Sequence, residues 1–280
     1  MGCVRERDEI VKMPDEFLEI STWVGRCPVN CIKYCPQEQN VARYKGKKVM
    51  SLGDFAKLTE TVPANVTYSW AGVTEPFVNH LTTDMMELVA KRGNPQILFT
   101  TGTNLSVEDA RRVAAIPFEW AILHRPDNCG IANIPVTPEY EQVIGLLIAS
   151  KNTEQIEVMN MGKHFITDGN ERLFRPGNES IKKRAGRVTC ASLRGPQYSL
   201  LPDGNLYFCC VTKGLANVVG SLWENSYPDL IKKHKVYAGN LAADPDSICH
   251  KCTRARNSLL HKTANHPIFG FRDYINAGRF

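Results

Sequence analysis

Three closely spaced cysteines near the N-terminus constrain this chain more than any other feature. Cys27, Cys31 and Cys35 are each separated by three residues. Three thiols cannot all pair with one another as disulfides, and the next residues supply no fourth ligand for a tetrahedral zinc site. Thiolates also hold four-iron clusters, and three of them leave one iron open to bind and activate a ligand. The spacing therefore favours a catalytic iron-sulfur site, and the alternative is a set of buried thiols without a metal.

Length and composition fit a barrel-like domain with a smaller domain attached. The chain has 280 residues, of which 43% are hydrophobic and 22% are charged, as is usual for a globular protein. No apolar run approaches the roughly 18 residues that span a bilayer, so we expect no membrane segment. The net charge of +5 is small, which permits an anionic partner without requiring one.

The N-terminus gives no sign of export or lipidation. It lacks the apolar segment of a signal peptide, and Glu6 stands where a myristoylation signal has Ser or Thr. Ten cysteines in such a chain indicate metal ligation instead of disulfides, because a reducing cytosol does not keep disulfides closed. We therefore expect a cytoplasmic protein.

Short apolar runs alternate with amphipathic ones over residues 17–162, which is typical of parallel strands joined by crossover helices. The predicted strands are 17–24, 65–71, 96–101, 120–124 and 155–159. The fold class is α/β, a β/α barrel or part of one. The three-cysteine loop follows the first strand, at the end of the barrel where function gathers.

The helices between these strands carry recognisable N-terminal signals. The predicted N-caps are Ser51, Ser106 and Thr137, and Pro138 takes the favoured first helical position. The last of these helices is predicted to bury an apolar face made of Ile144, Leu147 and Ile148.

The three-cysteine loop resembles the signature of radical S-adenosylmethionine enzymes, in which an aromatic residue precedes the third cysteine. Tyr34 is that aromatic residue. The family's usual spacing is three residues and then two, whereas this chain has three and three, so we expect a small bulge around Ile32 and Lys33. The resemblance implies a partial (β/α)6 TIM-like barrel that binds a [4Fe-4S] cluster and S-adenosylmethionine.

The loop after the second strand resembles the family's Gly-Gly-Glu-Pro segment, with Val73 and Thr74 in place of the two glycines. The resemblance implies that a backbone carbonyl of this loop and the Glu75 carboxylate accept hydrogen bonds from the ammonium group of S-adenosylmethionine. The alternative is a turn with an exposed glutamate.

Two further segments resemble cofactor-binding parts of the family. Thr100 begins a turn similar to the family's Thr-Asn-Gly-Thr segment. His124 and Arg125 end the fourth strand, where the family places groups near the ribose or carboxylate of the cofactor; a structural histidine is the alternative. The resemblance thus implies a cofactor-binding set of Tyr34, Gly72, Thr74, Glu75, Thr100 and His124.

A second set of cysteines lies in the last third of the chain. Asp203-Gly204 predicts a hairpin turn that brings Cys209 back beside Cys190, and Cys249 and Cys252 form a Cys-x-x-Cys pair. The pattern resembles the SPASM and Twitch extensions of radical S-adenosylmethionine enzymes, and the shorter Twitch form fits better. It implies one auxiliary [4Fe-4S] cluster with these four ligands, as in single-auxiliary-cluster dehydrogenases of the butirosin type. A structural zinc site is the alternative.

The predicted domains are the barrel at 1–178, the Twitch/SPASM-like domain at 179–256 and a tail at 257–280 that packs on the barrel. Arg184 lies in a segment that resembles the one preceding the first auxiliary cysteine in these relatives. The resemblance implies that Arg184 contacts the substrate or assists its deprotonation, and a surface arginine is the alternative.

The resemblance implies reductive cleavage of S-adenosylmethionine to a 5′-deoxyadenosyl radical that abstracts hydrogen from a substrate. A small polar molecule would be oxidised with the help of the auxiliary cluster, and a one-electron reductant such as flavodoxin or ferredoxin would be the partner. Modification of a peptide, or isomerisation of a nucleobase in nucleic acid, stays open; basic residues at 182–187 and 232–235 permit the latter. A non-catalytic, zinc-stabilised binding module is the alternative from another class.

Overall fold

The computed structural model describes residues 16–31, 37–126, 132–160, 183–209, 215, 217–252 and 255–257. Tyr34, Cys35 and the predicted bulge at residues 32 and 33 lie outside the described residues. The predicted domain boundary at residue 178 and the predicted tail beyond Asn257 lie outside them as well. The same holds for the three cysteines to which no ligand role was given, Cys3, Cys129 and Cys210.

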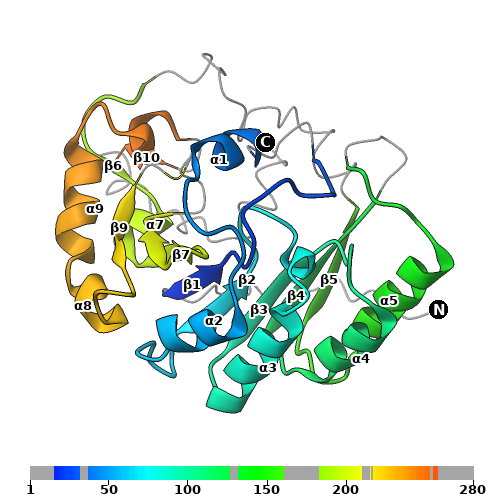
Figure 1. Cartoon of the computed structure of the whole chain (residues 1–280). Coiled ribbons are helices and arrows are strands. Elements are labelled where there is room, and N and C mark those ends of the chain that lie inside the picture. Colours follow the sequence, from blue (N-terminus) through cyan, green and yellow to red (C-terminus); the bar gives the residue numbers. More distant parts are fainter. Residues whose placement is uncertain are drawn as a thin grey trace.

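One mixed sheet forms the centre of the fold (Figure 1), with the strand order β5-β4-β3-β2-β1-β7-β8-β9. The strands from β5 to β1, and β7 beside β1, run parallel, whereas β8 and β9 continue the sheet antiparallel. The predicted α/β class with a parallel sheet is confirmed. The strands of this sheet are β1 (Phe17–Ile20), β2 (Thr67–Trp70), β3 (Gln96–Thr100), β4 (Trp120–Arg125), β5 (Ile156–Asn160), β7 (Gln197–Leu200), β8 (Asn205–Tyr207) and β9 (Val218–Ser221).

Helices α2 to α5 lie along one face of the parallel strands (Figure 1). Ser51, Ser106 and Thr137 each accept a hydrogen bond from the backbone N–H three residues further on, which confirms the predicted caps of α2, α4 and α5. The helices are α1 (Gln37–Arg43), α2 (Leu52–Leu58), η1 (Pro76–Val78), α3 (Thr82–Arg92), α4 (Val107–Ala115), α5 (Pro138–Ile148), α7 (Ala191–Arg194), α8 (Tyr227–Lys232), α9 (His234–Ala243) and η3 (Ile248–Lys251).

The two faces of the sheet differ in chemistry. Successive side chains of a strand point to opposite faces, and Leu18 and Ile20 of β1 join the main apolar core with the helices. Glu19 lies on the opposite face, which we call the inner face. It is in register with Ser69 of β2 and with Ser199 of β7, whose hydroxyl donates to its carboxylate at 2.8 Å. The inner face is therefore polar across β7, β1 and β2, although these residues are buried.

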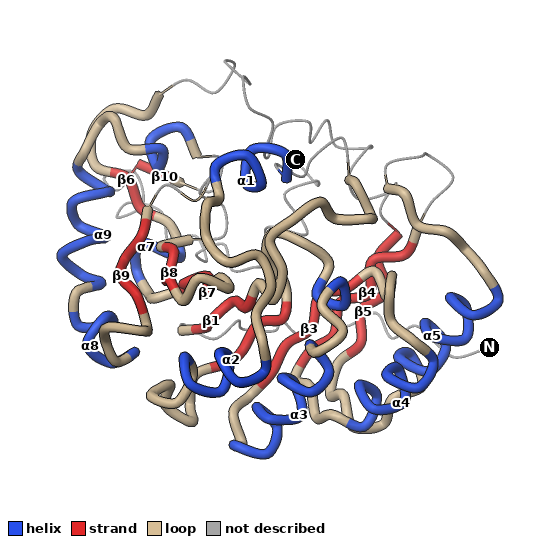
Figure 2. The backbone as a smooth tube through the Cα atoms, viewed as in Figure 1, coloured by secondary structure: helices blue, strands red, loops and turns tan. Residues whose placement is uncertain are grey.

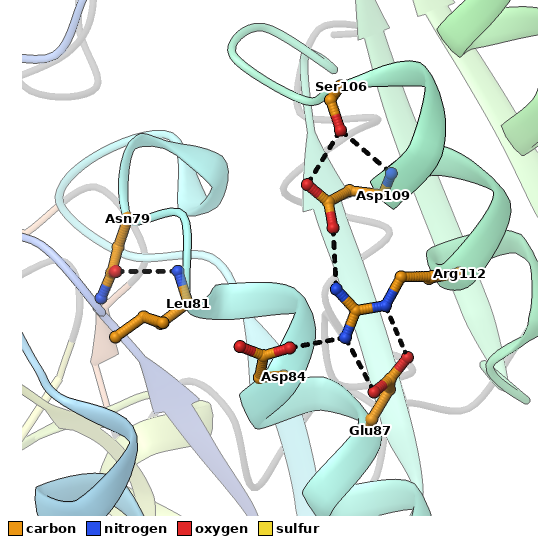
Figure 3. A network of polar contacts seen from close by, with 7 residues as sticks. All are labelled: Asn79, Leu81, Asp84, Glu87, Ser106, Asp109 and Arg112. Atoms are coloured by element: carbon orange, nitrogen blue, oxygen red, sulfur yellow. Dashed lines mark hydrogen bonds and ion pairs between the residues drawn. The ribbon is translucent and has the colours of Figure 1, made fainter.

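A polar network joins α3 and α4 on the outer side of the sheet (Figure 3). The guanidinium of Arg112 donates to both carboxylate oxygens of Glu87, at 3.0 and 2.9 Å, and also pairs with Asp84 and Asp109. The hydroxyl of Ser106, the cap of α4, donates to Asp109 at 2.9 Å. The Arg112 side chain thus connects α3 and α4, two helices that pack on the outer face of the parallel strands.

A smaller sheet pairs β6 (Val188–Thr189) antiparallel with β10 (Arg256–Asn257). The predicted hairpin is also present, since β7 pairs antiparallel with β8 and Gly204 takes the left-handed conformation, with φ of 82°, at the turn.

Local details differ from expectation at a few points. Each predicted strand is present, but the first ends at Ile20, because the chain then bends into the cysteine loop. Ile144 and Leu147 are buried as predicted, whereas the prediction for Ile148 is wrong: its side chain is 43% exposed. It is the last residue of α5 and lies about 40° around the helix from Ile144 and about 100° from Leu147, at the edge of the buried stripe. No helix in the described ranges has the length and apolar character needed to cross a membrane.

Candidate active site

The loop that carries Cys27 and Cys31 leaves the carboxyl end of β1, at the edge where the loops after β2 and β3 also emerge (Figure 2). Backbone hydrogen bonds fix its first half: Val24 N–H donates to Lys48 O at 2.8 Å, and Met50 N–H donates to Thr22 O at 3.0 Å. The Asn79 amide donates to both the Thr22 and the Met50 carbonyls. The loop is therefore held from two sides before it reaches the cysteines.

The two described cysteines of the loop pack against the start of α5. Cys27 is buried and Cys31 half-buried, in a small apolar cluster with Val29, Tyr140 and Ile144. The backbone N–H of Asn133 donates to Val29 O at 2.6 Å, which joins the loop to the segment leading into α5. This packing positions two of the three predicted ligands, whereas Cys35 lies outside the described residues.

The environment of Cys27 combines burial with backbone donors. Burial raises the pKa of the Cys27 thiol, and the backbone N–H groups of Glu75, Val29 and Asn30 act in the opposite direction. The Glu75 N–H points at the sulfur at 3.5 Å. Such donors stabilise a thiolate bound to a metal, so this cysteine suits the role of a cluster ligand.

The Glu75 carboxylate is buried and held by the end of β3. It accepts hydrogen bonds from the Thr100 hydroxyl, from the Thr101 N–H at 2.8 Å and from the Thr101 hydroxyl at 2.7 Å. Burial raises the pKa of Glu75, and these three donors oppose that rise together with the Phe77 backbone N–H. The alternative of an exposed glutamate in a turn is wrong, since Glu75 is only 6% exposed.

A carboxylate offers about four lone-pair positions, and the two threonines occupy three of those on Glu75. The Phe77 backbone N–H also hydrogen-bonds to this carboxylate, so an ammonium group would have to share an oxygen that is already bonded. Of the predicted cofactor-binding residues, the structure thus brings Glu75 and Thr100 into direct contact. Sequence reasoning missed Thr101, which stands where the family pattern has Asn.

The loop after β2 is fastened to the cysteine loop. Gly72 has φ of 110°, and a Cβ atom there would lie 1.9 Å from the Ser21 hydroxyl, so no other residue fits. The same hydroxyl accepts from the Val73 N–H at 3.1 Å, and the Thr74 hydroxyl donates to Trp23 O at 2.8 Å. Gly72 and Thr74 therefore have a structural role here, and their contact with a cofactor stays a prediction.

His124 is half-buried at the end of β4. The next residue, Arg125, forms an ion pair with Glu141 of α5, in which Nη2 donates to both carboxylate oxygens, at 2.8 and 3.0 Å. His124 thus lies at the same edge of the sheet as the cysteine loop, as predicted for a residue near the cofactor, although its role stays a prediction.

Two buried donors beside the cysteine loop have no hydrogen-bond partner among the described residues: the Trp23 indole N–H and the Tyr140 hydroxyl. Burial raises the pKa of Tyr140 to about 12, with Arg125 lowering it and Glu141 and Glu75 raising it. Buried donors without partners in a native protein call for a bound group. A cofactor with oxygen acceptors therefore fits this place. Sequence analysis missed Tyr140. The signal that could have found it is a polar hydroxyl group among the apolar residues on the buried side of α5.

The four cysteines of the second set lie within electrostatic range of one another. Cys190 caps the N-terminus of α7, Cys209 follows β8, and Cys249 and Cys252 lie on and just after η3. Burial raises the pKa of Cys190 to about 12, and the charges of Cys209, Cys252 and Cys249 add to the rise. Four thiols that act on one another this way repel when ionised, and they require a cationic centre to be stable as thiolates.

Small polar groups contact three of these four cysteines. The Ser192 hydroxyl donates to the Cys209 sulfur at 3.5 Å, and the Cys249 N–H donates to Ser247 Oγ at 3.2 Å. Cys252 N–H donates to Cys249 O at 3.3 Å, which closes the turn between the last two ligands. Within the described ranges, no three or more Cys, His, Asp or Glu side chains are grouped closely enough to hold a single metal ion.

Arg184 lies against the same turn. Its guanidinium donates to Cys252 O at 2.7 Å, its backbone N–H donates to His250 O at 3.0 Å, and its own carbonyl contacts the His250 ring nitrogen Nδ1 at 2.8 Å. Burial lowers the pKa of Arg184, and Cys252 acts in the opposite direction. Arg184 also lines, with Lys183 and Arg187, an open hollow of about 480 Å³. Its contact with a substrate stays a prediction.

No family model matches the chain, and no curated protein matches it in sequence. Solved structures do match. BtrN in complex with AdoMet and 2-DOIA shares 14% identity at a TM-score of 0.58, over 89% of this chain and 95% of that one. Native anSMEcpe with bound AdoMet shares 13% identity at a TM-score of 0.55, over 84% of this chain and 86% of that one.

Both neighbours are radical S-adenosylmethionine enzymes with auxiliary domains of the SPASM/Twitch type. At these sequence identities, the match shows a shared fold. The resemblance predicted from the cysteine motifs, including the butirosin-type comparison, is confirmed at that level. This chain has the fold of the radical S-adenosylmethionine enzymes that carry a SPASM/Twitch-type domain.

Proposed function

We propose that the chain is a radical S-adenosylmethionine enzyme, with Cys27, Cys31 and Cys35 as ligands of a [4Fe-4S] cluster. One observation carries the proposal: Glu75 donates its backbone N–H to the Cys27 sulfur, and its buried carboxylate is held by two threonines beside that sulfur. A single residue thus links a cluster ligand to a receptor for an ammonium group. The fold shared with proteins that bind AdoMet supports the same conclusion.

When bound, the cluster supplies one electron that cleaves S-adenosylmethionine to methionine and a 5′-deoxyadenosyl radical, which takes hydrogen from the substrate. The protein's own residues bind and orient S-adenosylmethionine. Glu75 accepts from the methionyl ammonium group, and Thr100 and Thr101 keep the carboxylate fixed for that contact. Gly72 and Thr74 hold the loop after β2 against the cysteine loop. Tyr34 and His124 complete the proposed cofactor site.

Cys190, Cys209, Cys249 and Cys252 would hold an auxiliary [4Fe-4S] cluster. Their mutual electrostatic influence supports a shared centre. With all four ligands supplied by protein, this cluster would accept an electron from the substrate instead of binding S-adenosylmethionine. The reaction is then a net oxidation of the substrate. A flavodoxin or ferredoxin supplies the electron at the first site. A reducing cytoplasm keeps the cysteines from forming disulfides, so that they can bind iron.

The proposed substrate is a small polar molecule. BtrN was solved with AdoMet and 2-DOIA, and anSMEcpe with AdoMet and the peptide Cp18Cys. The polar inner face across β7, β1 and β2, with Glu19 and Ser199 in contact, supports a ligand rich in hydroxyl or amino groups. A peptide substrate is the second candidate because of the anSMEcpe match.

Anaerobic reconstitution tests the proposal. The expected product is a brown protein with about eight irons per chain, if two four-iron clusters are bound, which forms 5′-deoxyadenosine on reduction with S-adenosylmethionine. The triple variant Cys27→Ser, Cys31→Ser, Cys35→Ser should lose that product and about half of the iron. A colourless, zinc-containing protein, or a triple variant that still cleaves S-adenosylmethionine, would overturn the proposal in favour of the zinc-stabilised module.

A further inference from the structure

We propose that the hydroxyl of Tyr140, on the first turn of α5, binds S-adenosylmethionine by donating a hydrogen bond to one of its oxygen atoms. This inference rests on the proposed function and adds a residue for which the sequence motifs gave no role.

The backbone places Tyr140 next to the cluster ligands. Thr137 caps α5, and its Oγ1 accepts from the Tyr140 N–H at 3.1 Å, so the start of the helix is fixed. The Tyr140 ring packs in the small apolar cluster that contains Cys27 and half-buried Cys31. Tyr140 therefore faces the cysteine loop from a rigid element.

The hydroxyl itself has no partner. Tyr140 is 7% exposed, and its oxygen is buried without a hydrogen bond from or to the described residues. Leaving a buried hydroxyl unpaired is costly, and native proteins rarely do so without a ligand or water at that place. The Tyr68 hydroxyl in the main core is also unpaired, but only that of Tyr140 belongs to the cluster of side chains around Cys27 and Cys31, and this place points to a bound group.

The surroundings of the hydroxyl indicate which group that is. The Tyr140 ring packs with Cys27, and the backbone N–H of Glu75, the proposed ammonium receptor, donates to that cysteine's sulfur, so Tyr140 and Glu75 lie on either side of one cluster ligand. A neutral phenol donates best to oxygen, and sulfur is a weak acceptor. S-adenosylmethionine presents such oxygens in its carboxylate and its ribose, whereas the cluster presents sulfur.

The test is the variant Tyr140→Phe in the reconstituted protein. Equilibrium dialysis with labelled S-adenosylmethionine should show a dissociation constant raised about tenfold, the effect of one buried hydrogen bond. The matched control is Tyr68→Phe, which removes a hydroxyl from the main core; its affinity should equal that of the wild type. Competition with methionine or with 5′-deoxyadenosine separates the two acceptors, because only the former carries the carboxylate and only the latter the ribose.

A second measurement excludes a merely structural role. Without cofactor, Tyr140→Phe should unfold at the same temperature as the wild type or higher, because no protein contact is lost. Equal affinity of the variant and the wild type for S-adenosylmethionine would overturn the inference, as would a lower unfolding temperature of the variant without cofactor. A wild type that holds iron but fails to bind S-adenosylmethionine overturns the proposed function and this inference together, whereas equal affinity in both proteins overturns the inference alone.

Discussion

The two cysteine sets differ in what surrounds them. At the first, Cys27 is approached by a backbone N–H, and the neighbouring Trp23 indole and Tyr140 hydroxyl have no hydrogen-bond partner among the described residues. At the second, four cysteines lie within electrostatic range of one another, and Arg184 and Ser247 bind the backbone of the turn that carries two of them. In the proposed function the first site receives a ligand and the second encloses a cluster, which is the usual difference between catalytic and saturated metal centres.

The largest expected effect comes from removing one ligand at each site. Cys27→Ser should reduce formation of 5′-deoxyadenosine to the level without enzyme, because the open site is lost. Cys249→Ser should leave that cleavage in place while abolishing oxidised product, measured by chromatography of both compounds. Loss of S-adenosylmethionine cleavage in both variants to the same degree would break the comparison.

A smaller effect is expected from Glu75→Gln. It removes the charge that would receive an ammonium group but keeps a side chain of the same size. A hydrogen bond to a charged group contributes about 1.5–3 kcal/mol, so the dissociation constant for S-adenosylmethionine should rise about 10-fold to 150-fold. Iron content at the second site should be unchanged. Unaltered affinity, measured by equilibrium dialysis, would contradict the role given to Glu75.

Gly72→Ala tests the close contact between the loop after β2 and the loop after β1. The left-handed backbone and the contact with Ser21 should cost about 1–3 kcal/mol of unfolding free energy, measured by urea denaturation. The control is Gly145→Ala, in the exposed middle of α5 with open space around it. That change should stabilise the protein by about 0.5–1 kcal/mol, because alanine favours a helix over glycine. Equal effects at both positions would refute the proposed constraint.

The smallest effect is expected at Arg184. This prediction tests whether Arg184 stabilises the turn that carries two cysteines of the second site. Arg184→Gln should weaken retention of iron by the four cysteines, because the turn after η3 loses its bond to Cys252 O. Changes to residues that hold metal ligands in place typically cost about 10-fold to 100-fold in metal affinity. Lys183→Gln, the adjacent exposed cation paired with Asp246, is the control and should change little. Competition with an iron chelator, followed by absorbance, measures both. Faster iron loss in the control would point to surface charge instead.

The sequence was informative where structure is local. Short apolar runs between amphipathic ones predicted the strands, and Ser51, Ser106 and Thr137 predicted the caps, because these signals depend on neighbouring residues alone. The convergence of Cys209 on Cys190 followed from the turn at Gly204. The prediction for Ile148 was wrong because a position one residue beyond the buried stripe falls outside the core.

Contacts between distant segments were not predictable in this way. The threonine pair that holds Glu75 comes from another strand, 25 and 26 residues away. Tyr140 reaches the cysteine loop only because α5 packs there. The parallel pairing of β7 with β1 joins segments 180 residues apart, and no periodicity within either strand encodes it.

That pairing bears on how the molecule can be divided. β1 leads into the first cysteine set and β7 into the hairpin of the second, and the two strands share a ladder of backbone hydrogen bonds. A fragment ending at residue 178 would leave β1 as a bare edge, with Glu19 deprived of Ser199 and open to strand addition by other chains. We therefore expect such a truncation to aggregate, so that each half can be studied only within the whole polypeptide.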